Sequence, residues 1–446
     1  MGGSWNVSRL VIRNGMILTL DDAATYLEHG AVVVQDDRIV WIGPDAQAPL
    51  AEGDTVIDAT DKIVMPGLTD LHFHTALGKG YNDHLPLWEY LDECWYPMIR
   101  ALDYDAAYWA ATASYTEAIK SGCTTVNDMY RKLDALADAA AEVGIRAILS
   151  NDIADDEYDL DTLQDNVDAF HRDHGRANGR IQVRMGIEWL PLASPELLRD
   201  TRRLADDLGI GIHIHLNESM TEVENSLQRF GKRPTELSYE LGLLGPDVVA
   251  AHCVHLSDDE IRMMAETGTS ISHNPSSNAK LGNGIARVPE MLAAGINVGL
   301  GHDAVECNNS GDLFETMKYA SLFHRAARQD SSLMPADLVL RMATRNGAKA
   351  LGTEAGQLAV GAKADIILVE TNSVEFTPML RDTPVHMSSH LVFAANGSAV
   401  DTTIVDGRVL MQGRQLLTVD EPTVVREANA AFRRVIDRME VVVREQ

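Results

Sequence analysis

The stretch Pro66-Gly67-Leu68-Thr69-Asp70-Leu71-His72-Phe73-His74-Thr75 places two histidines two residues apart at the end of an apolar run. Side chains alternate between the two faces of a β-strand, so we expect His72 and His74 on one face and Phe73 on the other. Two neighbouring imidazoles at a strand end supply half of the ligands that a zinc-type metal site needs. Because the chain has 15 histidines, this pair alone is weak evidence, and the remaining sequence decides its meaning.

The length and composition indicate a large folded protein. The chain has 446 residues, 45% of them hydrophobic, which supports a sizeable core. This length exceeds one ordinary domain and fits a large barrel with an accessory unit. The formal net charge of −28 disfavours nucleic acids and anionic membranes as partners, because both bind basic surfaces.

The cysteines and the absence of apolar segments predict a cytoplasmic protein. No signal peptide pattern and no run long enough to span a membrane is visible in the sequence. The cysteines form no C-x-x-C pair, which excludes cysteine-rich zinc modules and fits a reducing compartment. They are Cys94, Cys123, Cys253 and Cys307.

The chain divides into three blocks. Residues 9–65 contain short runs rich in β-branched residues, which predict half of a small β-sandwich. Short strand-like runs return at 361–369 and 402–410, so we expect one sandwich built from both chain ends. We assign residues 1–65 and 355–420 to this sandwich, 66–354 to a barrel domain and 421–446 to a C-terminal helix.

The middle block alternates apolar strand-like runs with helical patterns, for example at 105–121, 133–143 and 194–208. This alternation predicts parallel βαβ units. Eight strand ends over this length predict an α/β fold with a (β/α)₈ TIM-like barrel, whose reactive residues lie at the carboxyl ends of the strands. The expected ends lie at or near His74, Asp128, Asn151, Trp189, His215, His252, His273 and Asp303.

The run around Ile212 alternates strictly and predicts the fifth barrel strand. His213 and His215 share a face, and we select His215 as the candidate ligand because it lies nearer the barrel mouth. Glu218 follows the strand end, where a loop can bring its carboxylate beside the metal site. The alternative for Glu218 is an exposed loop acid, since Glu222 follows closely.

Two further strand ends carry candidates. His252 ends the sixth strand, whereas His255 begins the following helix and is expected at the surface. Asp303 ends the eighth strand, and the small residues after it leave its carboxylate free to face the barrel axis; a cap or a solvated charge is the alternative. We expect His302 to pack behind the site, and His273 either lines the pocket or makes a structural hydrogen bond.

The order of these residues is more specific than any one of them. Their arrangement resembles that of the amidohydrolase superfamily. It consists of His-x-His on the first barrel strand, His with Glu three residues later on the fifth, His on the sixth and Asp on the eighth. Within it, the pattern resembles the cytosine-, guanine-, triazine- and adenosine-type aminohydrolases, over nearly the whole chain. The stretches 230–234, 252–256 and 272–281 are most similar to the S-adenosylhomocysteine and methylthioadenosine deaminases.

This resemblance implies a hydrolytic deaminase that acts on a small heterocyclic molecule. Asp303 would accept a proton from a metal-activated water, Glu218 would protonate the ring nitrogen beside the attacked carbon, and His252 would polarise or orient the reacting groups. Ammonia would then leave. We also expect a homo-oligomer, either a dimer or a tetramer. The implied ligands of one Zn²⁺, or of Fe²⁺, are His72, His74, His215 and Asp303.

The chain departs from its adenosine-type relatives at three substrate-binding positions. Those relatives carry a glutamate, an arginine and a histidine where this sequence has Ile99, Asn151 and Trp189. We therefore expect a smaller or less polar substrate than a nucleoside, such as a pterin, triazine, pyrimidine or purine-like ring. Aromatic side chains are expected to stack on this ring. The expected substrate-binding residues are Trp88, Tyr90, Ile99, Asn151, Trp189 and His273.

Several alternatives stay open at the level of the sequence. The region 181–189 contains no lysine, which favours one metal ion, although Glu188 keeps a binuclear site possible. The same site would suit expulsion of chloride or an alkylamine from a triazine, amide or urea, or deamination of S-adenosylhomocysteine or methylthioadenosine. A catalytically silent scaffold is disfavoured, because every metal and proton-transfer position is filled.

Overall fold

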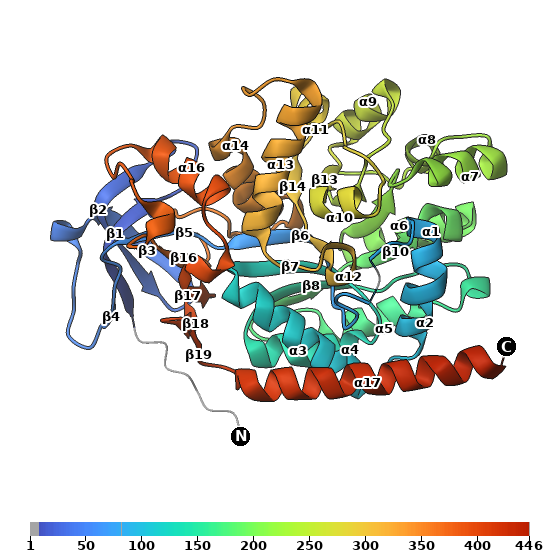
Figure 1. The fold of residues 1–446 in the computed structure, drawn as a ribbon, viewed down its shortest axis with the longest axis horizontal. Coiled ribbons are helices and arrows are strands. Elements are labelled where there is room, and N and C mark those ends of the chain that lie inside the picture. Colours follow the sequence, from blue (N-terminus) through green and yellow to red (C-terminus); the bar gives the residue numbers. More distant parts are fainter. Residues whose placement is uncertain (1–8, 82, 446) are drawn as a thin grey trace.

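The computed structural model describes residues 9–81 and 83–445, and it contains a mostly antiparallel sheet beside a larger α/β part (Figure 1). Of the ranges assigned above, residues 1–8, 82 and 446 lie outside the described part. None of the helices in the described ranges has the length and apolarity needed to cross a membrane.

Both chain ends contribute to one nine-stranded sheet, with β16 pairing antiparallel to β5. Whether these strands form a two-layer sandwich stays a prediction. The run 402–410 forms two strands rather than one, because Asp406 and Gly407 both adopt positive φ and close a tight turn. The strands are β1 (Leu10–Leu18), β2 (Tyr26–Gln35), β3 (Arg38–Pro44), β4 (Thr55–Asp58), β5 (Lys62–Pro66), β16 (Ile366–Glu370), β17 (Val400–Val405), β18 (Arg408–Gln412) and β19 (Gln415–Leu416).

The α/β part contains two parallel five-stranded sheets, which confirms the predicted fold class. The chain runs directly from one sheet to the other at Arg184 and again at Gly301–His302, so the strands follow one another in barrel order. The strands are β6 (Leu68–His74), β7 (Cys123–Met129), β8 (Arg146–Ser150), β9 (Ile181–Val183), β10 (Met185–Trp189), β11 (Ile212–Leu216), β12 (Val248–His252), β13 (Ser270–His273), β14 (Val298–Leu300) and β15 (Asp303–Ala304). All eight predicted strand ends lie within one residue of an observed end.

Several helices of the α/β part begin at residues whose side chains accept from the free N–H groups of the first turn. The side chain of Asp103 accepts from the Ala106 N–H before α3, and that of Ser194 accepts from the Leu197 N–H before α6. The helices are α1 (Leu87–Tyr90), α2 (Tyr96–Arg100), α3 (Tyr104–Lys120), α4 (Leu133–Val143), α5 (Leu163–Asp173), α6 (Pro195–Leu208), α7 (Met220–Phe230), α8 (Pro234–Glu240), α9 (Asp258–Thr267), α10 (Pro275–Lys280), α11 (Val288–Ala293), α12 (Val305–Asn308), α13 (Leu313–Arg328), α14 (Ala336–Arg341), α15 (Gly347–Leu351), α16 (Pro384–Phe393) and α17 (Glu421–Glu445).

The last helix, α17, lies along α3 at the outside of the barrel (Figure 1). Ala431 and Val435 are fully buried in this contact, whereas Val425 is exposed. The helix therefore buries one face and leaves the other to solvent, as its amphipathic sequence predicts.

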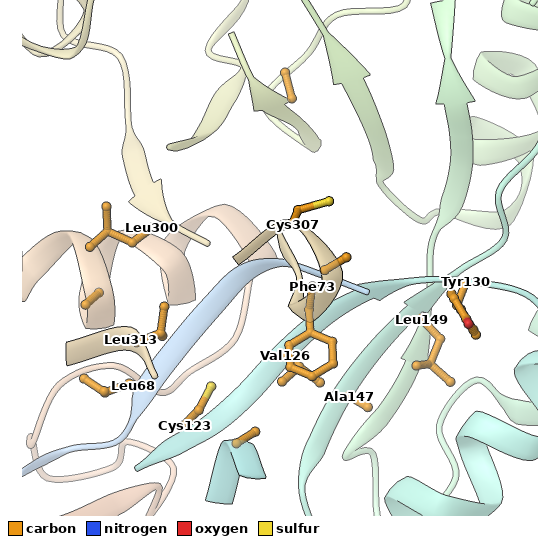
Figure 2. Packing of buried hydrophobic residues seen from close by; sticks show 14 of the residues in the cluster. Leu68, Phe73, Cys123, Val126, Tyr130, Ala147, Leu149, Leu300, Cys307 and Leu313 are labelled. Atoms are coloured by element: carbon orange, nitrogen blue, oxygen red, sulfur yellow. The ribbon is translucent and has the colours of Figure 1, made fainter. Parts of the chain in front are cut away.

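The alternation predicted for the opening stretch determines which side chains face the barrel axis. Phe73 is 2% exposed and points from β6 into the hydrophobic cluster that contains Cys123 and Val126 (Figure 2). Its ring lies 5.9 Å from that of Tyr115 on α3. His72 and His74 consequently face the opposite way, toward the axis.

Candidate metal centre

Three histidines and one aspartate meet at the carboxyl ends of β6, β11 and β15. The ligand atoms of His72, His74 and His215 lie within 4.8 Å of one another, and those of His72, His252 and Asp303 form a second such group. Nε2 of His74 is 3.1 Å from Nε2 of His215. Oδ1 of Asp303 is 3.4 Å from Nε2 of both His72 and His74.

The second ring nitrogen of each candidate ligand already has a partner. Nδ1 of His74 contacts the Met129 carbonyl oxygen at 2.6 Å, and Nδ1 of His215 contacts the Glu188 carbonyl oxygen. When Nδ1 donates, Nε2 carries a lone pair toward the centre. Backbone carbonyls hold ligating histidines of metal sites in this way, so the donor set fits a divalent metal.

His72 is oriented by a side chain instead of the backbone. Its Nδ1 lies 2.9 Å from Nε2 of His213, whose Nδ1 is 3.4 Å from the Ser150 hydroxyl. Nε2 of His72 is buried without any hydrogen-bond partner in the described structure. A buried polar atom of this kind is expected to have a partner, and a metal ion at the centre would provide it. His213 thus lies behind the site, where the sequence analysis placed it.

Burial keeps these imidazoles neutral. It lowers the pKa of His72 to about 3, and it also lowers the pKa values of His74 and His215. Neutral imidazole is the form that binds a metal. Burial alone would raise the pKa of Asp303, but the surrounding imidazoles, that of His72 foremost, hold it well below its usual value. The donor set is therefore three neutral nitrogens and one carboxylate.

Asp303 is fixed in a left-handed backbone conformation with a φ of 71°. The Ser277 hydroxyl donates to its Oδ2 at 2.5 Å, and the Ala304 N–H donates to its Oδ1 at 2.7 Å. His252 also has a φ of 71°. Left-handed conformations of residues other than glycine are strained and concentrate at functional sites, where the surrounding structure holds them in place.

Glu218 lies in the turn after β11 and is 5% exposed. The Asn283 side-chain amide donates to its Oε1 at 2.9 Å. Its backbone N–H and that of Asn217 donate to the buried carboxyl of Glu222, at 2.6 and 2.9 Å, which fixes the turn. Burial, followed by the negative charge of Asp303, raises the pKa of Glu218 well above its usual value. A carboxyl of this kind holds a proton that it can transfer.

His252 lies between the two carboxyls of the site. Its Nδ1 is 3.6 Å from Oε1 of Glu218, and its Nε2 is 3.8 Å from Oδ2 of Asp303. Nδ1 also lies 2.9 Å from Oδ1 of Asn278. The sequence does not reveal that Asn278 orients His252 and Ser277 orients Asp303, because it shows only a run of polar residues after β13.

A cavity of about 410 Å³ opens onto this centre. Tyr90 and Trp189, two of the expected substrate-binding residues, line it. Trp88 packs on the Trp189 ring, with centroids 4.3 Å apart. The lining residues are His74, Leu87, Tyr90, Leu91, Trp95, Glu188, Trp189, His215, Glu218, His252, Leu281, Asp303, Ala304 and Cys307.

Four residues predicted to bind substrate lie outside this lining, and one of them is Trp88, which packs on Trp189. Ile99 is 1% exposed and belongs to the hydrophobic core of the α/β part. The Asn151 amide donates to Asp161 at 2.5 Å, so it is used within the protein. Nε2 of His273 lies 3.4 Å from Nε2 of His324, which matches the alternative expectation that His273 makes a structural hydrogen bond.

Other histidines near the site have protein partners. His302 is fully buried, with Nδ1 2.5 Å from Oδ2 of Asp70. His255 is half-buried rather than at the surface, because its Nε2 contacts the Asn283 carbonyl oxygen at 2.8 Å. Glu188 lines the cavity but belongs to neither of the two ligand groups found in the described ranges. Burial, followed by the negative charge of Glu218, raises the pKa of Glu188 to about 8.

Comparison with known proteins adds independent findings. Residues 63–410 match the model of the amidohydrolase family. The chain is 40% identical to a 5-methylthioadenosine/S-adenosylhomocysteine deaminase of Desulforudis audaxviator, over 96% of this chain and 99% of the relative. It is 41% identical to a 5'-deoxyadenosine deaminase of Methanosarcina acetivorans, with the same coverage. A zinc-bound adenosine deaminase from Xanthomonas campestris superposes with a TM-score of 0.90 at 28% identity, covering 96% of this chain and 99% of that one.

Proposed function

We propose, from the premise that this chain belongs to the amidohydrolase family, that it deaminates a nitrogen heterocycle hydrolytically with one Zn²⁺ per chain. One observation carries the proposal. Three neutral imidazoles and the Asp303 carboxylate converge at a cavity whose wall includes Glu218, a carboxyl with a raised pKa. This arrangement combines the ligands of a hydrolytic metal with a proton donor.

His72, His74, His215 and Asp303 would hold the metal. A divalent metal in this place supplies electrophilic catalysis and makes a water molecule more acidic. In the proposed reaction, an Asp303 carboxylate oxygen takes up a proton from the attacking water. Glu218 delivers its proton to the ring nitrogen beside the attacked carbon. The proton held by Asp303 then passes to the amino group, the carbon–nitrogen bond breaks and ammonia leaves, while Glu218 takes up the proton of the new hydroxyl group as the carbonyl forms. His252, held by Asn278, orients the reacting groups between these carboxyls.

The cavity favours a ring without a sugar or amino-acid substituent. Among the described residues, its lining contains no lysine or arginine that would pair with a substrate carboxylate. The positions at which adenosine-type relatives anchor polar substituents hold Ile99, Asn151 and Trp189. Ile99 is buried, and Asn151 is bonded to Asp161. A bare pterin-, pyrimidine- or purine-like ring therefore fits better than S-adenosylhomocysteine.

A second candidate substrate is a 5'-modified adenosine without a charged group. The Methanosarcina relative, which is 41% identical over nearly the whole chain, is named a 5'-deoxyadenosine deaminase. Ammonia release from 5'-deoxyadenosine, methylthioadenosine and S-adenosylhomocysteine, compared with free amino heterocycles, separates the two candidates. Chloride and alkylamine release from triazines is measured in the same panel. A clear preference for S-adenosylhomocysteine would contradict the bare-ring proposal.

The mechanism predicts separate effects for Glu218 and for a metal ligand. Glu218→Gln should lower kcat about 10²- to 10⁴-fold, since it removes the proposed proton donor, while metal content stays unchanged. His215→Asn should lower both metal content and activity. Elemental analysis of the purified proteins, alongside ammonia assays, checks both results. Full turnover by Glu218→Gln, or active protein without stoichiometric transition metal, would contradict the proposal.

A further inference from the structure

Glu188 is a cavity-lining carboxyl that the proposed mechanism leaves unused. It lies near the end of β10, is 4% exposed and shares the cavity wall with His215 and Glu218. Its backbone N–H donates to the Ile153 carbonyl at 2.9 Å, and its carbonyl contacts Nδ1 of His215. The backbone N–H and carbonyl of Glu188 are therefore both fixed by contacts, and its carboxyl is held beside the metal centre.

The carboxyl oxygens of Glu188 are poorly satisfied within the protein. Oε2 has no hydrogen-bond partner in the described structure, and Oε1 has the Tyr96 hydroxyl at the long distance of 3.4 Å. Buried carboxyls are normally hydrogen-bonded or paired, because an unpartnered one is costly.

The surrounding charges do not neutralise Glu188. The nearest basic atom in the described ion pairs, Nδ1 of His215, is 4.0 Å away and already contacts the Glu188 carbonyl. The charge of Arg131 lowers the pKa of Glu188, but this side chain pairs with Asp161 at 2.9 Å. A hydrogen-bond donor arriving with the substrate would supply the missing partner.

The rest of the wall suits a flat ring. Leu91, Trp95, Trp189 and Leu281 provide apolar surface around the polar groups. A ring between these side chains can direct its polar edge only toward the few polar groups in the lining. Glu218 is the proposed donor to one ring nitrogen, so Glu188 is available to the nitrogen or amino group on the other side of the attacked carbon.

We propose that Glu188 determines substrate specificity by accepting a hydrogen bond from a ring N–H or amino group beside the attacked carbon. This inference rests on the proposed function and narrows its substrate class. The expected substrates are amino-substituted lactam rings, such as isocytosine or pterin, in which a ring N–H lies next to the carbon that carries the amino group. A 6-aminopurine presents only acceptor nitrogens around that carbon, which would leave Glu188 facing another acceptor.

The test combines changes to the substrate ring with substitutions of Glu188, and it uses the metal-loaded enzyme. Wild-type protein should deaminate isocytosine or pterin with a KM about 10- to 100-fold lower than that for versions methylated at the ring N–H, the range expected when a buried acceptor is left without its donor. Glu188→Met, which keeps the length but removes the acceptor, should raise the KM of the unmethylated ring by a similar factor. It should leave the KM of the methylated ring nearly unchanged. Glu188→Gln should have an intermediate effect, since its amide still carries one acceptor oxygen.

Binding without turnover provides a second readout. In the Glu218→Gln background, calorimetric Kd values for isocytosine and pterin should rise about 10- to 100-fold when Glu188→Met is added. Glu93→Gln, an exposed carboxyl in the segment before Tyr96, is the matched control and should change neither KM nor Kd. Thermal unfolding of each variant separates misfolding from lost recognition, and the methylated rings test the wild-type protein without any substitution.

The possible failures are distinguishable. If no amino heterocycle releases ammonia, the proposed function itself is wrong. If ammonia is released but methylation and the Glu188 substitutions leave KM and Kd unchanged, the function stands and the inference about Glu188 is overturned. A wild-type preference for 6-aminopurine or 4-aminopyrimidine over the lactam rings overturns it as well.

Discussion

At the scale of single residues, each metal-facing histidine has one ring nitrogen occupied by a protein atom. His74 and His215 use backbone carbonyls, whereas His72 uses another histidine, His213. These contacts decide which nitrogen of each ring faces the centre, since a neutral imidazole has one donor and one acceptor nitrogen. The residues behind the site therefore contribute to the proposed metal binding.

We predict that His213→Gln weakens metal binding without removing a ligand. The substitution disturbs the contact that orients His72, and losses of this kind typically reduce metal affinity about 10- to 100-fold. Competition with a chelator measures the affinity of each protein for Zn²⁺. His171→Gln, at an exposed position on α5, is the control and should bind Zn²⁺ like the wild type. Equal affinity for His213→Gln would show that His72 is oriented by other contacts.

Glu222 predicts a specific dependence of stability on pH. Burial raises its pKa from 4.5 to about 8 in the folded protein. Between these values the folded state holds a proton that the unfolded state has released, so stability is highest below pH 4.5 and falls as pH rises toward 8. The contribution is on the order of 1 kcal/mol per pH unit in this window.

Glu222→Gln should flatten this part of the stability profile, because the amide does not titrate. Urea unfolding at several pH values between 5 and 8 measures the slope. Glu224→Gln, an exposed neighbour on the same helix, should leave the slope unchanged. An unchanged slope in Glu222→Gln would mean that Glu222 is ionised in the folded protein across this range.

At the scale of elements, β10 approaches the end of β8 closely enough to require a glycine. A Cβ atom on Gly186 would lie 1.7 Å from the Asn151 carbonyl oxygen. The side chain of Asn166 on α5 links the same elements, since its Oδ1 accepts from the N–H groups of both Asn151 and Gly186. Glu188 and Trp189 lie two and three residues after Gly186, so this contact sets how far the strand carries them into the cavity.

We predict that Gly186→Ala destabilises the protein by about 1–3 kcal/mol, as overpacking of a dense interior does, and raises the substrate KM by displacing Glu188 and Trp189. Urea unfolding and steady-state kinetics measure the two effects. Gly311→Ala is the matched control, because its Cβ would meet only the flexible Glu117 side chain at 3.3 Å. Wild-type stability in Gly186→Ala would mean that β10 can shift without cost.

At the scale of the whole molecule, a buried ion network joins the barrel to the sheet made from the chain ends. Arg146 on β8 donates to both carboxylate oxygens of Asp365, at 2.8 and 3.0 Å, and to Asp406 at 3.1 Å. Asp365 precedes β16, and Asp406 lies in the turn between β17 and β18. The network therefore connects segments more than 200 residues apart in the sequence.

We predict that Arg146→Met destabilises the protein by about 3–5 kcal/mol, because it leaves the buried carboxylate of Asp365 without its ion-pair partner. Asp406 keeps Lys363 at 3.1 Å. Metal affinity should change little, since the network lies away from the ligands. Arg203→Met removes exposed ion pairs with Asp200 and Asp207 and should cost about 0–1 kcal/mol. Denaturant unfolding of the three proteins gives the comparison, and equal stability of the two variants would exclude a structural role for the network.

The sequence by itself determined the fold class, the barrel strands and the order of the candidate metal residues. Strand alternation separates His72 and His74 from Phe73, and amphipathic patterns with capping residues place α3, α4 and α6 to within one residue. These features depend on local periodicity, which one sequence displays directly. The division of 402–410 into two strands was not predicted, because the turn between them depends on a positive φ at Asp406. Aspartate also occurs in helices and strands, so its presence alone does not indicate a turn.

Only the tertiary structure decided which side chains share the cavity. Ile99, Asn151 and His273 occupy sequence positions that suggest substrate contact, yet the fold places them in the core or against Asp161 and His324. The contacts of His213 with His72 and of Ser277 with Asp303, and the unpartnered carboxyl of Glu188, join different strands and loops. Such contacts depend on how the strands are tilted and packed around the barrel, which local periodicity does not specify.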